Sequence, residues 1–431
     1  MRRISYRYGI SLAGFVLFVL IWGLRLCLPA AYLAFTRIPD GITRLVPFGD
    51  LTSILTAGRC WHLGVDVYHP SACMAGGVFN YAPLLLRAAD FGLGPADSIA
   101  GGVLLCLGFL ASLALLPPPE SRAEFGYRLA ACLSTTTGFA LEQCNFDVAL
   151  FILIALALPL LGRGSWARAL AYATFLLAAA LKFYPGALMF LAVRERWRQL
   201  LLAVGVSLAT AALYLAYFWK DVVTAIVIIP LVAPFRATFG RIDVPHGLGS
   251  HHILSAIRMN HLLHHAIFTS DGQVVNLLSL AMTGIGLLAS AKAARHYANR
   301  LKTLDTMRLL YLIGGCLVTV FCFYTVQNIY YRAIFLLFTL PGLWSMQPQD
   351  RRVKILLAIL LFLLWEAIFR DIIVIIPSLS VQIVFWILRE ALWWLAAIEL
   401  GGITLAFAIA QLAPMLGKAW LVKPPCRPHN I

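Results

Sequence analysis

The chain has 431 residues, of which 61% are hydrophobic and only 12% are charged, and its formal net charge is +15 at pH 7. Together with a mean hydropathy of +0.84, this composition excludes a soluble globular domain and predicts a polytopic membrane protein.

Apolar runs long enough to cross a bilayer recur along the chain. The hydrocarbon core is about 30 Å thick and a helix rises about 1.5 Å per residue, so one crossing needs roughly 20 residues. The first run, from Ile10 to Phe35, is too long for a signal peptide and no small-residue cleavage pattern follows it, so we predict an uncleaved first span. Further runs begin near Ile99, Phe146, Leu200, Val274, Leu309, Ile355 and Ala391.

The placement of basic residues predicts the orientation. Most of the 34 lysines and arginines fall in alternate connections between the runs, and cytoplasmic loops are the ones that retain positive charge. We therefore predict an all-α polytopic protein with about 12 transmembrane helices (range 10–13), in the cell inner (plasma) membrane and with both termini in the cytoplasm. The positive charge reflects topology and attraction to anionic membrane lipid, and nucleic acid is not an expected partner.

One apolar run is predicted to be broken. Arginines flank both sides of the run from Leu170 to Val193, and the charge rule places both groups in the cytoplasm. The chain must then turn back at Lys182-Phe183-Tyr184-Pro185, because the residue before a proline avoids helical geometry. Each leg would be only about 20 Å long, which predicts short helices packed inside protein.

Polar residues gather on the predicted outer face of a single transmembrane domain, 1–417. Its large outer loops are expected at 36–97 and 220–273, and 418–431 is expected to form a cytoplasmic tail. Ionisable groups at span ends are costly in lipid, so their clustering on one face predicts a functional site. The residues concerned are Asp50, Glu142, Asn145, Asp147, Lys182, Tyr184, His251, Arg258, Tyr331 and Arg332.

Several short motifs, in order over residues 48–345, carry a family resemblance. In the first outer loop they are FGD at 48–50, AGRCWHLGVDVYHP at 57–70 and FNYAPL at 79–84, and later ones are EQCNFD at 142–147, KFYPG at 182–186 and the Tyr331-Arg332 pair. With these motifs the chain resembles glycosyltransferase family 87. That family comprises polyprenyl-phosphate-mannose-dependent mannosyltransferase-like membrane proteins of the GT-C superfamily.

The resemblance implies a GT-C-like fold and a function. A hexose or pentose, with mannose as first candidate, would pass from a polyprenyl-phosphate donor to a lipid or glycan acceptor on the outer face by one inverting displacement. Asp50 matches the loop carboxylate that takes the acceptor proton, and Lys182 and Arg332 are the expected contacts of the donor phosphate. The substrate cavity would include Glu142, Asn145, Asp147, Tyr184, His251, Arg258 and Tyr331. No metal or other cofactor is required.

Each of these roles has an alternative. Asp50 could cap an amphipathic helix, Asp66 reads as a turn residue, and Lys182 and Arg332 could be interfacial residues that extend toward water. Cys60, Cys73 and Cys144 would lie on the outer side, where one disulfide can form between two of them. A transporter or flippase of a lipid-linked glycan would share the polar outer face, although no repeated half is visible in the sequence.

Overall fold

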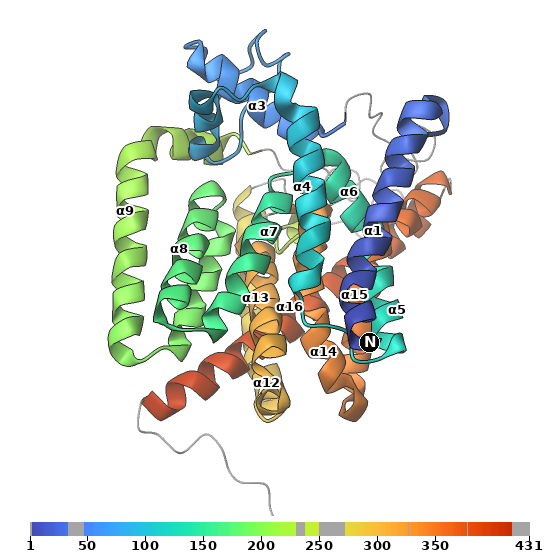
Figure 1. Cartoon of the computed structure of the whole chain (residues 1–431), viewed down its shortest axis with the longest axis vertical. Helices are drawn as coiled ribbons and strands as arrows, with labels where there is room; N and C mark the ends of the chain where they lie inside the picture. The colour runs from blue at the N-terminus through green and yellow to red at the C-terminus, as the bar shows by residue number, and fades with distance from the viewer. Residues whose placement is uncertain are drawn as a thin grey trace, which may run out of the picture.

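The computed structural model describes residues 2–32, 47–229, 238–249, 272–325, 327–376 and 378–415, and all that follows refers to these. Helices make up almost all of this part (Figure 1). The first half contains α1 (Arg2–Cys27), α3 (Gly49–His62), η1 (Pro83–Phe91), η2 (Pro95–Asp97), α4 (Ser98–Ser112), η3 (Leu113–Leu115), α5 (Arg122–Cys132), α6 (Thr135–Gln143), α7 (Asp147–Ala157), η4 (Leu158–Gly162), α8 (Ser165–Leu181), η5 (Tyr184–Arg194) and α9 (Trp197–Val227).

The second half adds one small sheet to further helices. Strands β1 (Thr238–Phe239) and β2 (Asn328–Ile329) pair antiparallel, with Thr238 opposite Ile329. The remaining elements are α10 (Asp243–Gly249), α12 (Gly272–Tyr297), η6 (Leu301–Thr303), α13 (Thr306–Thr325), η7 (Tyr330–Phe338), α14 (Leu340–Met346), η8 (Gln347–Gln349), α15 (Arg351–Ile375) and α16 (Leu379–Met415).

The expectation of an all-α membrane protein is confirmed for the described residues. Six helices are long and apolar enough to cross a membrane, or seven if the pair Thr135–Gln143 and Asp147–Gly162, bent by 109°, counts as one span. Their surfaces suit lipid, because large apolar side chains such as Leu104, Leu208 and Leu288 are exposed. The six are Tyr6–Cys27, Pro95–Leu115, Trp197–Val227, Val275–Tyr297, Thr306–Thr325 and Leu379–Pro414.

The predicted break in the run from Leu170 to Val193 is also present. Helix α8 ends at Leu181 and the 3₁₀ helix η5 begins at Tyr184, so the chain turns back where Lys182 and Pro185 had indicated. The two legs are about 25 Å and about 22 Å long by their rise per residue. They pack against each other, and η5 also packs on α13. The expectation of legs covered by protein holds for much of η5 but not for α8, whose Leu170 and Leu177 are exposed.

Two sets of contacts mark the two ends of the bundle. At one end Phe48 N donates to Glu142 O at 2.8 Å, which joins the start of α3 to the end of α6. At the other end Arg308 donates to Glu124 Oε1 at 3.1 Å and to Pro341 O at 2.6 Å. Polar groups therefore meet at both ends, and apolar helices connect them.

The segment from α3 to Asp97, which we call the loop layer, lies across the first of these ends (Figure 1). Its core contains Ile54, Val67, Phe79 and Leu86, and a disulfide joins Cys60 to Cys73. The predicted turn at Asp66 is present, since Asp66 Oδ1 accepts a hydrogen bond from Tyr68 N at 2.9 Å. The disulfide that the sequence allowed is therefore formed, and it closes the loop that follows α3.

The disulfide gives a first prediction. Its cysteines are 13 residues apart, and closing a loop of that size stabilises a fold by about 3 kcal/mol. The variants Cys60→Ser and Cys73→Ser are expected to lose a similar amount of unfolding free energy and to expose residues 61–72 to protease. Limited proteolysis of the purified protein measures the rate of cleavage in this segment. The control is Cys27→Ser, which removes an exposed free cysteine. Equal cleavage rates in all three variants would contradict it.

Candidate functional site

The start of α3 positions Asp50. Phe48 precedes the helix in the left-handed conformation (φ 56°, ψ 46°), which is unfavourable for a residue with a side chain and needs support from packing. That support comes from α4, where the ring of Phe48 lies so close to Gly102 that a Cβ there would come within 2.2 Å of it. The ring and the hydrogen bond to Glu142 O thus set the direction in which α3 begins.

Asp50 lies in the first turn of α3 and contacts Asn145. Its Oδ2 accepts a hydrogen bond from Asn145 Nδ2 at 2.6 Å, and the same amide nitrogen lies 2.7 Å from Tyr331 Oη and 3.3 Å from Tyr81 Oη. An amide NH₂ has two hydrogens, so the two short contacts account for both. Asn145 itself is fully buried. It therefore connects the half-buried carboxylate of Asp50 to the interior.

The other side of Asn145 faces two cations and a second carboxylate. Lys182 Nζ donates to Asn145 Oδ1 and to Asp147 Oδ1, each at 2.9 Å. Arg332 forms an ion pair with Asp147, with 3.5 Å between Nε and Oδ2, and Tyr184 donates its hydroxyl proton to Asp147 Oδ1. Because Lys182 takes the amide oxygen of Asn145, the NH₂ group must face Asp50.

The resulting cluster is nearly dry and balanced in charge. Asp147 has no exposed surface, Lys182 is 7% exposed, and the Arg332 side chain is 17% exposed. Two carboxylates thus face two cations, and four ionisable groups this close together at the end of an apolar bundle are costly to bury unless they are paired. Such arrangements are typical of functional sites.

The environment makes Asp50 a better proton acceptor than an ordinary aspartate. Burial raises the pKa of its carboxyl group above the usual value, and this effect outweighs the Asn145 hydrogen bond and the charge of Lys182, which both lower it. A higher pKa favours proton uptake by the carboxylate.

Asn328 supports Arg332 from the opposite side. Arg332 Nη1 donates to Asn328 Oδ1 at 2.6 Å, and Asn328 Nδ2 donates to Cys322 O at 2.6 Å. Asn328 is buried at the start of β2, which pairs with β1, and Gln327 Nε2 beside it donates to Asp243 Oδ1 at 2.5 Å. The small sheet therefore positions Arg332.

The structure brings together seven of the ten residues that the sequence singled out: Asp50, Asn145, Asp147, Lys182, Tyr184, Tyr331 and Arg332. Glu142 lies close by on α6 and contributes its backbone oxygen to Phe48. His251 and Arg258 lie outside the described residues. Tyr81 and Asn328 were not assigned a role from sequence, although both stand within or beside the motifs.

Two of the alternatives do not describe these residues. The N-cap of α3 is Phe48, and Asp50 makes its hydrogen bond across to Asn145. Lys182 and Arg332 are paired with Asp147 inside the protein, which differs from side chains that extend along the interface toward water. Glu366 and Glu399, within α15 and α16, are also buried in protein. Among the described residues, no group of His, Cys, Asp and Glu could hold a metal ion.

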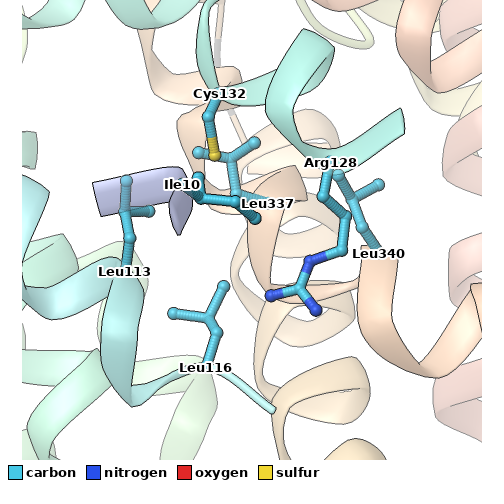
Figure 2. A pocket seen from close by; sticks show the side chains of 7 residues that line it. All are labelled: Ile10, Leu113, Leu116, Arg128, Cys132, Leu337 and Leu340. Atoms are coloured by element: carbon cyan, nitrogen blue, oxygen red, sulfur yellow. The ribbon is translucent and has the colours of Figure 1, made fainter. Parts of the chain in front are cut away.

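The cavity in Figure 2 is separate from this cluster. It is lined by Ile10, Leu113, Leu116, Arg128, Cys132, Leu337 and Leu340. Arg128 is its charged member, and this guanidinium already donates to Pro117 O at 2.6 Å and to Glu124 Oε1 at 3.2 Å. The cavity thus lies near Pro117, at the end of α4 that is farther from the loop layer, and contains none of the residues around Asp50.

Comparison with known proteins adds no relative. No family model, no curated protein and no solved structure matches the chain. The resemblance to glycosyltransferase family 87 therefore stays a prediction from sequence motifs.

The pairing around Asp147 gives a second prediction. Asp147→Ala would leave Lys182 and Arg332 buried without their carboxylate, and breaking a buried ion pair in this way costs about 3–5 kcal/mol. We expect a clear fall in unfolding temperature or folded yield in detergent. The control is Asp66→Ala, which removes an exposed aspartate and should cost less than about 1 kcal/mol. Equal stability of the two variants would contradict this.

Proposed function

We propose that this protein is an integral-membrane glycosyltransferase that uses a polyprenyl-phosphate-linked sugar. The sugar would be a hexose or pentose, with mannose as first candidate, and the acceptor a lipid or glycan. The observation that carries the proposal is the half-buried carboxylate of Asp50, joined through Asn145 to Lys182, at the end of an apolar helix bundle. A lipid-linked donor would present its phosphate and sugar at this level, with its chain beside the apolar helices.

In the proposed reaction Asp50 acts as general base. The acceptor hydroxyl gives its proton to the Asp50 carboxylate while its oxygen forms a bond to the anomeric carbon. The bond from that carbon to the phosphate oxygen breaks, and its electron pair leaves with the phosphate. Support comes from the hydrogen bond that Asn145 makes to Oδ2, because it holds the carboxylate in one orientation.

The leaving phosphate needs positive charge nearby. Lys182 and Arg332 are the proposed source, since both are held in place before substrate binds. Asp147 keeps these two cations side by side in a poorly solvated place, where electrostatic interactions are strong. A phosphate would share the cations with Asp147, and this arrangement favours binding through charge without requiring a metal.

We also propose the topology expected from the charge bias, with about 12 crossings, both termini in the cytoplasm and the site on the outer face of the plasma membrane. The Cys60–Cys73 disulfide in the loop layer supports this, because disulfides persist in oxidising compartments. The opposite end of the bundle contains arginines, among them the buried Arg128 and Arg308 and the exposed Arg352, which fits the cytoplasmic side.

The alternative function is a transporter or flippase of a lipid-linked glycan. A specific observation favours it: Glu366 of α15 and Arg389 and Glu390 of α16 are charged and buried within helices. Arg389 lies 3.8 Å from Glu366 and contacts Glu390. Buried charges inside membrane helices are common along transport pathways. Only a transferase, however, requires Asp50 to accept a proton from a substrate.

Asp50→Asn tests the proposed chemistry. Asparagine keeps the size of the side chain but cannot take the acceptor proton, so sugar transfer is expected to fall about 10²-fold or more. The assay is transfer from labelled polyprenyl-phosphate-mannose in membranes, followed by other polyprenyl-phosphate sugars, at equal protein abundance. Asp66→Asn, in the same loop layer, should retain activity. Equal transfer by both variants would remove Asp50 as the base, and no transfer from any donor by the unaltered protein would favour the transporter.

The pH profile tests the state of Asp50. A general base works when it is deprotonated, so kcat/KM should rise with pH. Because the pKa of Asp50 is raised, the midpoint of this rise should lie above the pKa of about 3.9 of a free aspartate. Asn145→Leu removes a hydrogen bond that lowers this pKa, so the rise should move to still higher pH. An unchanged midpoint, or a shift to lower pH, would contradict the assignment.

A further inference from the structure

Helix α9 consists of two parts that meet at Phe218. The backbone angles of Phe218 (φ −109°, ψ 16°) depart from helical values and interrupt the helix. The part from Trp197 to Tyr217 is about 31 Å long, which is enough by itself to cross the hydrocarbon core. In Figure 1 the remainder of α9 turns sideways toward the middle of the molecule. The part before Phe218 is therefore long enough to complete the crossing, which would leave the last part of α9 at the boundary of the membrane.

This last part has an exposed apolar face. Trp219, Val223, Ile226 and Val227 are 61%, 40%, 63% and 77% exposed. Their spacing of four, three and one residues places all of them on one side of a helix. A set of large apolar side chains this exposed, and aligned in this way, is expected where a helix contacts something apolar.

The opposite face of the same segment packs on protein. Ala225 is 6% exposed and belongs to the core of the loop layer, and Ile228 packs against that core. These two residues lie about half a turn away from the exposed face. The segment is therefore held between the loop layer on one side and whatever covers its apolar face on the other.

We propose that residues 219–227 form an interfacial helix whose apolar face lies among the acyl chains of the lipids on the site's side of the membrane. We favour lipid as the occupant because the exposed face continues the surface of the crossing part of α9. That part has no buried residue, and its Leu208, Leu213 and Tyr217 are exposed. A tryptophan followed by a lysine, Trp219-Lys220, is the combination that membrane interfaces favour.

The contacts beside this helix are also of the kind found at the surface of a membrane. Arg87 of η1 donates to Tyr217 Oη at 2.7 Å, and its guanidinium lies 4.6 Å from the ring centre of Trp61. Arginine and aromatic rings together are typical of the headgroup region. The loop layer would thus be attached to the membrane through α9. Tyr81, which packs on the core of this layer and lies 3.3 Å from Asn145, would be carried with it.

The experiment measures the depth of this helix in liposomes. Single cysteines are introduced by Val223→Cys and Ile226→Cys, on a background of Cys27→Ser and Cys426→Ser, with Cys426 lying outside the described residues. After spin labelling, the accessibility to oxygen and to a water-soluble nickel complex gives the depth of each label. We expect both labels about 5–10 Å below the lipid phosphates, with oxygen accessibility well above nickel accessibility.

Matched controls define the scale. Leu208→Cys reports the hydrocarbon region, Ser71→Cys in the loop layer reports water, and the background without added cysteine reports labelling of the native cysteines. Depth at both test positions would support the interfacial helix. Nickel accessibility like that of Ser71→Cys would overturn it, and low accessibility to both reagents, with an immobilised label, would overturn it in favour of contact with a second copy of the chain. The measurement requires no sugar transfer, so it does not depend on the proposed function.

Discussion

The carboxylate of Asp147 is the interaction on which the site depends. It has no exposed surface and is contacted by Lys182, Tyr184 and Arg332. Lys182 and Tyr184 come from the turn between α8 and η5, and Arg332 comes from η7, so one buried anion at the start of α7 joins two other segments of the chain. In surroundings of low polarity, neither the carboxylate nor the two cations could be buried alone, and the network is stable only when it is complete.

Asn145 connects this buried network to Asp50 at the surface. Its amide has a defined orientation, because Lys182 occupies the oxygen and Asp50 and Tyr331 occupy the nitrogen. The backbone before Asp50 is equally constrained, through the left-handed Phe48 and its close fit on Gly102. In the proposed reaction, a carboxylate held from both directions in this way would lose little freedom on meeting a substrate, which favours proton transfer.

Much of this arrangement could be predicted from sequence. The apolar runs predicted the helices, charge bias and Pro185 predicted the turn at Lys182, and the polar residues at span ends included most of the cluster. The contacts themselves could not be predicted. That Lys182 and Arg332 share Asp147 depends on how α7, η5 and η7 pack, and local sequence contains no signal for such a contact. The role of Asn328 in holding Arg332 could not be predicted either, because a buried amide next to a short strand resembles any turn residue. The helix break at Phe218 was equally invisible, since no proline or glycine marks it.

The tight winding of η7 has a consequence for how this protein can vary. With about three residues per turn, successive side chains point in directions about 120° apart. Tyr330 stacks on Phe139, Tyr331 reaches Asn145, and Arg332 reaches Asp147, so three successive side chains of one turn each make a contact of their own. Inserting or deleting a single residue here would rotate all three side chains away from their partners together. Length changes over evolution should therefore accumulate in the connections outside this turn, while the spacing from Asn328 to Arg332 stays constant.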